Sequence, residues 1–243
     1  MKIAIISDIH GNKIALDNVL ENIKLNSADK IFVLGDLAMG GYDPNYTIEK
    51  LFQLKDSMGE DFEIIQGNTD KLIVNFTKEF YDNFYEKNPL MFSALALDDT
   101  EIKPENKNLL ANLEEQKMVE INGVKILLTH GSPRKQDENL FPDTPVETIE
   151  QAVANTDADV ILCGHTHIPC GFSLNSNKTV VNVGSVGRSM TDDKMPIYLM
   201  MTVNKNGEFS FEHKKVYYDN KAVAQIIEKR NFKHSVEFSK LYL

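Results

Sequence analysis

Five short polar motifs in the chain carry side chains that can bind a metal ion, and each follows an apolar run typical of a buried strand. Imidazole, carboxylate and amide groups are all used as metal ligands in proteins. In an open α/β sheet, ligands bind at the carboxyl ends of the strands. The repeated placement therefore predicts that these groups, far apart in the sequence, meet at one site. The motifs are Asp8-Ile9-His10, Gly35-Asp36, Gly67-Asn68-Thr69-Asp70, His130-Gly131 and Gly164-His165-Thr166-His167.

Each motif by itself has an ordinary explanation. An aspartate such as Asp8 or Asp36 could cap a helix or occupy a turn, and a lone histidine is more often a hydrogen-bonded loop residue than a ligand. Five such placements at one sheet edge favour a shared site over coincidence.

The candidate ligands comprise four imidazoles, two carboxylates and one amide, which is too many for a single tetrahedral ion with an open position. The set suits two divalent metal ions that share a ligand. Its mixture of nitrogen and oxygen donors favours manganese, iron or zinc over magnesium or calcium. The predicted metal ligands are Asp8, His10, Asp36, Asn68, His130, His165 and His167.

The elements that must position these groups begin with alternating strands and helices. Apolar runs at residues 2–7, 30–35 and 62–67 indicate buried strands. Between them, Leu16, Val19 and Ile23 recur at helical spacing after the capping residue Asn12, and a second helix is indicated around residues 48–52. Strands alternating with helices predict an α/β domain with parallel strands.

Residues 71–118 show little strand pattern and predict a helical insertion. Phe76, Phe80 and Phe84 are spaced by four residues, which would align them along one helix face. Leu109, Leu110 and Leu113 indicate another helix. Because the insertion begins at the third polar motif, we expect it to overhang the site as a cap.

The remaining sequence returns to strands, now joined by tight turns. Asn122-Gly123 between two apolar runs predicts a hairpin. The frequent hairpins predict mixed sheets. We expect a single domain over residues 1–243, with a core at about 1–70 and 119–218, a cap at about 71–118 and a helical tail at about 219–243. Helices are expected near 146–153 and 221–228, and strands near 159–164, 171–174, 179–184, 196–203 and 208–216.

Charge and composition argue against nucleic-acid or membrane partners and against secretion. The net charge of −10 without a block of basic residues argues against nucleic acid or an anionic membrane as the main partner. The short apolar run at the start of the sequence does not resemble a signal peptide, and no stretch approaches the roughly 20 apolar residues of a spanning helix. Cys163 and Cys170 do not form a disulfide framework, so we expect a cytoplasmic protein.

In this order and spacing, the five motifs resemble those of the calcineurin-like metallophosphoesterases over about Met1 to Val216, and above all the small bacterial and archaeal phosphodiesterase branch. The resemblance implies a mixed α/β fold, a four-layer αββα sandwich of two mixed β-sheets flanked by helices. It implies one metal held by Asp8, His10, Asp36 and His167. It implies a second metal held by Asp36, Asn68, His130 and His165, with Asp36 bridging and with these four residues as the catalytic set.

The resemblance implies a dinuclear-metal-dependent enzyme that hydrolyses phosphodiester or nucleotide phosphoanhydride bonds with a hydroxide that the metals activate. Many family members have a histidine after the metal-binding asparagine, and this histidine protonates the leaving group. The chain has Thr69 there, a poor acid at neutral pH, so substrates with good leaving groups should be preferred. Val183 also replaces the proline of a late family motif that Val181 to Ser185 otherwise resembles.

Other charged residues have proposed supporting roles. Lys71, Arg134 and Arg188 follow the polar motifs or the late glycine-serine loop and are candidate substrate-binding residues, although each could be a solvated surface charge. Asp70 is expected either to support His10 or another ligand from behind or to be a turn residue. The expected partner is a small phosphorylated substrate, and a homodimer is left open.

Three alternatives compete with this interpretation. A phosphomonoesterase or protein phosphatase of the same family would share the metal site. A single-zinc or amidohydrolase-type hydrolase would need a longer chain with an early His-x-His motif. A catalytically silent protein-interaction scaffold, as in a retromer subunit of this fold, is disfavoured because every expected ligand is present.

Overall fold

The computed structural model describes residues 1–243 except for the side chain of Phe84, and its centre consists of two β-sheets. In the first sheet, the order is β10-β9-β1-β2-β3; β1, β2 and β3 are parallel, β9 runs antiparallel to β1, and β10 runs antiparallel to β9. The bounds are β1 Lys2–Ile6, β2 Lys30–Val33, β3 Phe62–Ile64, β9 Ile197–Val203 and β10 Phe209–Lys215.

The second sheet is also mixed, with the order β4-β5-β6-β8-β7. Its three inner strands are parallel, and the edge strands β4 and β7 pair antiparallel to them. Asn122 and Gly123 both adopt positive φ in the β4–β5 turn, as the two-residue hairpin requires. The bounds are β4 Gln116–Ile121, β5 Val124–Thr129, β6 Val160–Cys163, β7 Cys170–Ser173 and β8 Thr179–Asn182.

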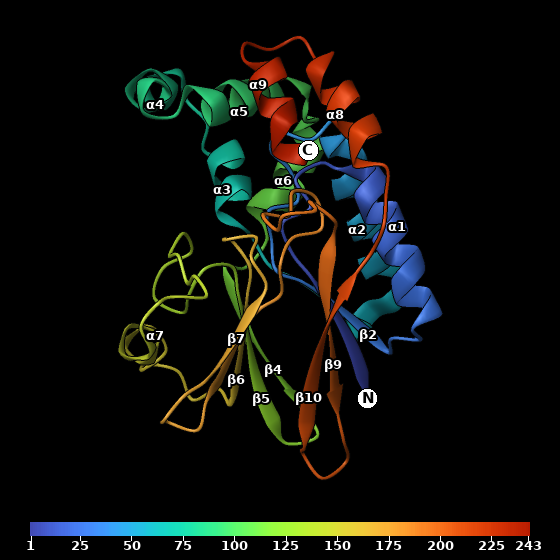
Figure 1. Ribbon diagram of the computed structural model, residues 1–243, viewed down its shortest axis with the longest axis vertical. Helices are drawn as coiled ribbons and strands as arrows, with labels where there is room; N and C mark the ends of the chain where they lie inside the picture. The colour runs from blue at the N-terminus through green and yellow to red at the C-terminus, as the bar shows by residue number, and fades with distance from the viewer.

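The two sheets pack face to face, and helices cover their outer faces (Figure 1). Alternation along β1 separates the two sides: Ile3 and Ile5 pack between the sheets, whereas Ala4 and Ile6 pack toward the helices. In β6, Leu162 faces the other sheet and Ile161 faces the outer helix α7 (Val146–Ala152). This order of layers confirms the predicted αββα sandwich.

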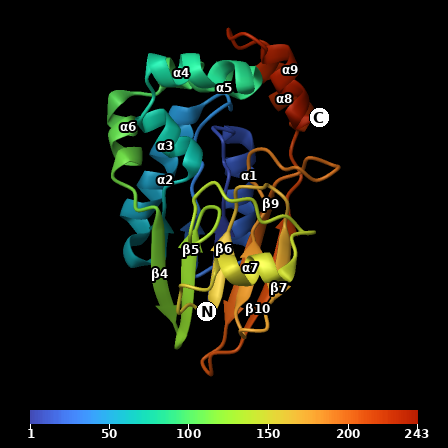
Figure 2. The ribbon, with the colours of Figure 1, turned by 90° about the vertical axis from the view of Figure 1, so that its left-hand side faces the viewer.

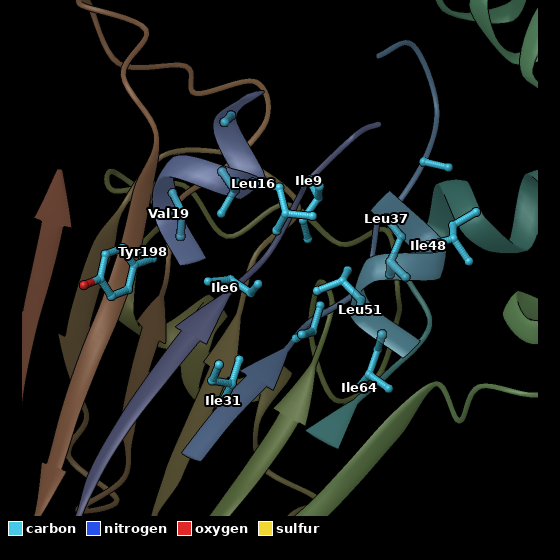
Figure 3. Packing of buried hydrophobic residues seen from close by; sticks show 14 of the residues in the cluster. Ile6, Ile9, Leu16, Val19, Ile31, Leu37, Ile48, Leu51, Ile64 and Tyr198 are labelled. Atoms are coloured by element: carbon cyan, nitrogen blue, oxygen red, sulfur yellow. The ribbon is translucent and has the colours of Figure 1, made fainter. Parts of the chain in front are cut away.

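Helices α1 (Lys13–Leu25) and α2 (Pro44–Met58) cover the first sheet. Their apolar residues, including Leu16 and Leu51, are fully buried against Ile6 in the core shown in Figure 3. Asn12 begins α1 by accepting a hydrogen bond from the N–H of Ala15 at 3.2 Å, as the sequence predicted.

The remaining helices gather at the end of the sandwich where the parallel strands finish (Figure 2). They form two groups, one from the middle of the chain and one from the C-terminal tail. The first group is α3 Asn68–Val74, α4 Lys78–Phe84, η2 Tyr85–Lys87, α5 Pro89–Glu101 and α6 Pro104–Ala111. The tail forms α8 Asn220–Glu228, α9 Ser235–Ser239 and η3 Lys240–Tyr242, while a short turn η1 Gly59–Asp61 precedes β3.

The helical region differs from expectation in two details. Phe76 lies between α3 and α4 because the hydroxyl of Thr77 accepts a hydrogen bond from the N–H of Phe80 at 3.1 Å and starts a new helix. The side chain of Phe84 lies outside the described residues. Leu113 follows the end of α6 rather than continuing it. The proposed boundaries of cap and tail remain predictions.

Across the part of the chain that the structure describes, every helix is too short or too polar to cross a membrane.

Candidate metal centre

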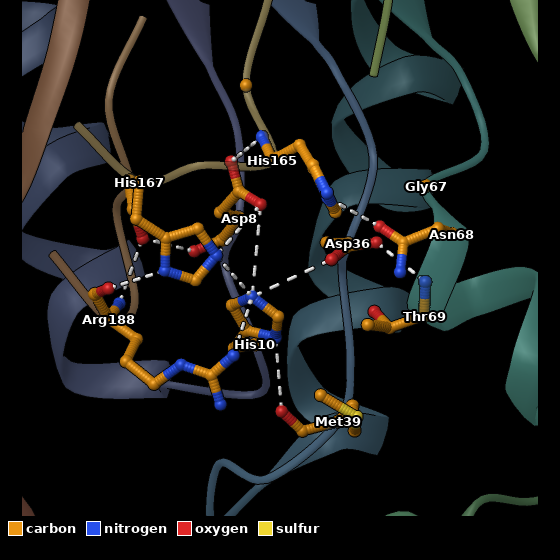
Figure 4. Close-up of polar contacts among 12 residues, drawn as sticks. Asp8, His10, Asp36, Met39, Gly67, Asn68, Thr69, His165, His167 and Arg188 are labelled. Carbon is orange, nitrogen blue, oxygen red and sulfur yellow. Dashed lines mark hydrogen bonds and ion pairs between the residues drawn. The ribbon is translucent and has the colours of Figure 1, made fainter. Parts of the chain in front are cut away.

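The loops that follow β1, β2, β3, β5 and β6 meet at one end of the sandwich, beneath the helical region. Six of the seven predicted ligands are seen pointing toward one another in Figure 4. The seventh, His130, belongs to the same cluster because its Nε2 lies 3.4 Å from Asp36 Oδ2 and 3.8 Å from Asp8 Oδ1. Residues separated by up to 159 positions in the sequence therefore share one pocket.

The first group of potential ligand atoms belongs to Asp8, His10 and His167. The Nε2 atoms of His10 and His167 are 3.1 Å apart. Asp8 Oδ1 lies 3.2 Å from His167 Nε2 and 3.8 Å from His10 Nε2. Asp36 Oδ2 lies 3.7 Å from His10 Nε2, so its carboxylate borders this group as well.

The second group comprises Asp8, Asp36 and His130. Asn68 and His165 close its outer side, where His165 Nδ1 and Asn68 Oδ1 are 2.9 Å apart. The backbone N–H of His165 donates to Asp8 Oδ2 at 3.1 Å and thereby fixes the loop against the carboxylate. Both Asp8 and Asp36 lie between the two groups, so either carboxylate is placed to contact two ions.

The orientation of three histidines tests whether these residues fit a metal. Backbone carbonyl oxygens face the Nδ1 atoms of His10, His130 and His167 at 3.1, 2.7 and 2.6 Å, so each Nδ1–H donates outward. Each Nε2 then directs a lone pair into the pocket. His130 Nε2 and Asp8 Oδ1 are buried without a hydrogen-bond partner. Converging lone pairs and unpaired carboxylate oxygens repel one another unless a cation lies between them, so the residues fit a divalent metal.

The electrostatics of the pocket also favour positive charge. Burial alone would raise the pKa of Asp8, but the imidazoles of His167 and His130 outweigh it and lower that pKa to about 2. Burial likewise opposes charge on His130, yet Asp36 and Asp8 raise its pKa to about 10. Without a metal ion, a proton on His130 Nε2 therefore supplies the positive charge that these carboxylates attract, and a metal ion bound at Nε2 would replace that proton. Burial and the guanidinium of Arg188 hold the pKa of His10 well below its usual range. Burial would also raise the pKa of Asp36, but the neighbouring His130 outweighs it and lowers that pKa. The interior thus keeps both carboxylates ionised and attracts cations to them.

Backbone strain is concentrated at the same residues. Asp8, His10, Asp36, His165 and His167 have φ values of 55°, 49°, 53°, 67° and 61°, in the left-handed region. This conformation costs an L-residue roughly 1–2 kcal/mol. Aspartate tolerates it better than most residues, but five strained positions in one pocket indicate that the fold aims these side chains inward at the expense of stability.

Close backbone packing positions Asp36. A Cβ on residue 67 would lie 2.1 Å from both the backbone N and Oδ1 of Asp36, so only glycine fits beside this carboxylate. The N–H of Thr69 donates to Asp36 Oδ1 at 2.9 Å, and Asp70 accepts hydrogen bonds from the N–H groups of Leu37 at 2.9 Å and Gly67 at 3.0 Å. Asp70 therefore holds the loop that carries Asp36, and its hydrogen bonds go to this loop and not to His10.

We expect Gly67→Ala to displace Asp36, since backbone atoms must move to admit the methyl group. Overpacking of this kind destabilises a protein by about 1–3 kcal/mol. An ångström-scale displacement of a reacting group can lower turnover by about 10²-fold. Thermal unfolding and bound-metal analysis check this. Gly171→Ala is the matched control, because its Cβ would meet only Val180 O at 3.9 Å; equal behaviour of the two variants would contradict the prediction.

The three predicted substrate-binding cations have different surroundings. The guanidinium of Arg188 is buried beside the first ligand group, with Nη2 3.5 Å from His10 Nε2. Arg134 Nε donates to Glu138 at 2.8 Å on the exposed flank. Lys71 pairs with Glu115. The structure therefore brings Arg188 to the centre, while Arg134 and Lys71 line a neighbouring groove and are held by acidic side chains.

A cavity of about 310 Å³ opens over the predicted metal ligands. Its floor includes Asp36, Asn68, His165, His167 and Arg188. Its walls are mostly apolar and come from the loop after β2 and from helices α3 and α5. The apolar wall residues are Met39, Leu72, Met91, Phe92 and Leu95.

Two residues that support the site, Asn182 and Ser185, had no predicted role. Asn182 Nδ2 donates to Gly164 O at 2.6 Å and to Thr166 Oγ1 at 3.0 Å, which fixes the turn between the late histidines. Ser185 Oγ donates to Asp8 O at 2.9 Å and accepts from the N–H of Arg188 at 3.0 Å. Both lie in the stretch from Val181 to Ser185 that resembles a family motif, which was the signal available for finding them.

Comparisons with known proteins give one family match and several relatives of similar sequence or fold. A profile described as the calcineurin-like phosphoesterase superfamily domain matches residues 1–206. The uncharacterized protein MJ0912 of Methanocaldococcus jannaschii is 31% identical over 247 residues, covering 94% of this chain and 93% of that protein. The hypothetical protein PH1004 from Pyrococcus horikoshii OT3 is similar in structure with a TM-score of 0.85 at 20% identity, covering 98% of this chain and 97% of that chain. A metallophosphoesterase from Sphaerobacter thermophilus has a TM-score of 0.75 at 20% identity over 100% of both chains.

Proposed function

The chain belongs to the calcineurin-like phosphoesterase superfamily, and on this premise we propose that it hydrolyses phosphodiesters or nucleotide phosphoanhydrides with the help of two divalent metal ions. The observation that carries the proposal is the convergence of three imidazole Nε2 atoms on the buried, unpaired oxygen of Asp8. A structural role alone does not explain such an arrangement, because repulsion among these groups would destabilise the fold.

We propose that Asp8, His10, Asp36 and His167 hold one ion and that Asp36, Asn68, His130 and His165 hold the other. Manganese, iron or zinc would suit the mixed nitrogen and oxygen ligands. Bound there, such ions supply Lewis acidity toward a phosphate ester and lower the pKa of water. The carbonyl oxygens behind the histidines keep each Nε2 directed inward.

The chain's own residues orient the substrate. The buried guanidinium of Arg188 is placed to bind a nonbridging phosphate oxygen. The hydroxyl of Thr69 donates to Ala38 O at 3.1 Å, so its proton is committed to the backbone and is not offered to a leaving group. The position at which many family members carry a proton donor is therefore without one, which supports a preference for leaving groups that depart as anions.

We expect a diester or an anhydride to be the better substrate. In a manganese-supplemented screen, bis-p-nitrophenyl phosphate or diadenosine tetraphosphate should exceed p-nitrophenyl phosphate in kcat/KM, because the apolar cavity walls can contact a second organic group that a monoester lacks. Within a series of aryl diesters, kcat/KM should fall steeply as the leaving-group pKa rises, since general acid catalysis is worth about 10²–10⁴-fold. Cyclic nucleotides are included in the screen as further phosphodiester substrates. A clear monoester preference, or no dependence on leaving group, would contradict this.

The decisive experiment for the proposed function is metal analysis of the purified protein followed by assay with and without chelator. We expect bound transition metal, loss of hydrolysis on chelation and recovery on adding manganese. Metal-independent binding of a protein partner without hydrolysis of any phosphate ester would favour the scaffold alternative. Higher activity on monoesters or phosphoproteins would favour a phosphomonoesterase or protein phosphatase of the same family.

A further inference from the structure

The C-terminal tail, residues 219–243, lies wholly beyond the residues that match the family domain. It nevertheless packs against the catalytic end of the molecule, where α8 and α9 lie beside α5 (Figure 2). Phe238 and Tyr242 in this tail are fully buried in a cluster that includes Ala94 of α5. The tail is therefore built into the fold at the site rather than appended to its surface.

The tail braces the loop that supports His10. Gly40 has a φ of 90°, and a Cβ there would lie 2.3 Å from the Phe238 ring, so the ring rests directly on the glycine backbone. Tyr242 Oη donates to Gly40 O at 3.4 Å. The next residue toward the N-terminus, Met39, supplies the carbonyl that accepts from His10 Nδ1 at 3.1 Å. The tail thus presses on the segment that orients a proposed metal ligand.

The same phenylalanine also lies under the guanidinium of Arg188. Arg188 Cζ is 5.6 Å from the centroid of the Phe238 ring, within cation–π distance. The guanidinium otherwise contacts Met91 Sδ at 3.7 Å and His10 Nε2 at 3.5 Å. These neighbours are neutral or weakly polar, so the buried cation retains strong affinity for an incoming anion.

We propose that the tail is part of the substrate site and that Phe238 is a positioning residue, which holds the guanidinium of Arg188 where it meets the substrate phosphate. The proposal rests on the proposed function, since it needs a phosphate in the cavity above the metal ligands. It extends the active site to a segment outside the family domain. The ring supplies a flat, uncharged support, so it stabilises the arginine without competing for the anion.

The test compares Phe238→Leu with wild type in steady-state kinetics and in calorimetric binding of inorganic phosphate to the metal-loaded protein. Cation–π contacts of this kind correspond to about 3- to 30-fold in binding. We expect KM and the phosphate dissociation constant to rise together by about that factor. Metal content per chain is measured alongside, because the Phe238 ring also packs on Gly40, next to the residue whose carbonyl orients His10. Phe238→Met, which fills the space without an aromatic face, should behave in the same way if the leucine variant folds poorly.

Phe232→Leu is the matched control, because it removes the same atoms from the same tail. The Phe232 ring packs on Phe238 at 5.7 Å and lies near Arg230 rather than Arg188. An Arg188→Ala background completes a double-mutant cycle, in which Phe238→Leu should have no further effect on phosphate affinity.

The outcomes separate this inference from the proposed function. If wild type hydrolyses phosphate esters but Phe238→Leu and Phe232→Leu have equal KM and phosphate affinity, the positioning role is overturned. An undiminished effect of Phe238→Leu in the Arg188→Ala background overturns it as well. If wild type shows no metal-dependent hydrolysis while Phe238→Leu still weakens phosphate binding through Arg188, the proposed function fails and the tail's role in anion binding stands.

Discussion

Asp36→Asn should lower phosphate-ester hydrolysis by about 10²–10⁴-fold, because metal-based charge stabilisation is worth several kcal/mol. The substitution keeps the volume and shape of the side chain but removes its charge. The N–H of Thr69 donates to Oδ1, so the new amide oxygen should keep that position. The amide NH₂ would then replace Oδ2, which lies 3.7 Å from His10 Nε2 and 3.4 Å from His130 Nε2. A hydrogen-bond donor would thus replace a carboxylate oxygen between His10 and His130. The NH₂ group cannot bind a cation, so the variant should hold metal poorly.

The measurements are kcat/KM on the best diester and metal content per chain, with circular dichroism to verify folding. Asp157→Asn is the matched control, since Asp157 is exposed and forms a surface ion pair with Lys125. We expect that control to retain wild-type activity and metal. Asp36→Asn with full metal content and activity within threefold of wild type would refute the assigned role of Asp36.

Much of this site could be predicted because its chemistry lies next to strong local patterns. Asp8 and His165 follow apolar runs whose burial is unambiguous, and parallel strands place their carboxyl ends at the same edge. The β4–β5 hairpin was equally accessible, since Asn122 and Gly123 accept the positive φ values that its turn needs. Where local preference and tertiary structure agree, sequence reasoning is sufficient.

The parts that sequence did not predict depend on contacts between distant segments. The spacing of four residues predicted that Phe76 and Phe80 share one helix face. In the structure, Thr77 caps the start of a new helix that contains Phe80 and leaves Phe76 outside it. Arg134 and Arg188 are equivalent as candidates in the sequence, but only the fold buries one beside His10 and pairs the other with Glu138. The support of Arg188 by Phe238, fifty positions away, has no periodic signature at all.

The strained loops link the candidate metal site to the stability of the whole domain. Five inward-pointing residues have positive φ, and imidazole nitrogens and buried carboxylates are crowded together, so the pocket by itself opposes folding. The surrounding sheets and helices must hold it in place. A bound cation would relieve the repulsion, which ties the stability of the whole domain to occupancy of the pocket.

We therefore expect transition-metal ions to stabilise the folded chain strongly. The candidate ligands come from five loops between Asp8 and His167, so the unfolded chain offers no comparable site. Binding to the native state alone at 100 times Kd contributes about 2.7 kcal/mol per site. For a chain of 243 residues, this corresponds to an increase in Tm of roughly 5–10 °C. Thermal unfolding of chelator-treated protein, titrated with manganese or zinc, measures the effect without reference to any substrate.

Two comparisons make this expectation specific to the pocket. Magnesium and calcium prefer all-oxygen ligands, so they should raise Tm less than manganese or zinc at equal concentration. Asp36→Asn should lose most of the metal-dependent increase, whereas Asp157→Asn should keep all of it, because Asp157 lies in an exposed pair with Lys125. A Tm that does not respond to millimolar manganese or zinc, or that rises equally in Asp36→Asn, would show that these side chains do not hold the ions, since a cation bound elsewhere has no reason to depend on the Asp36 carboxylate.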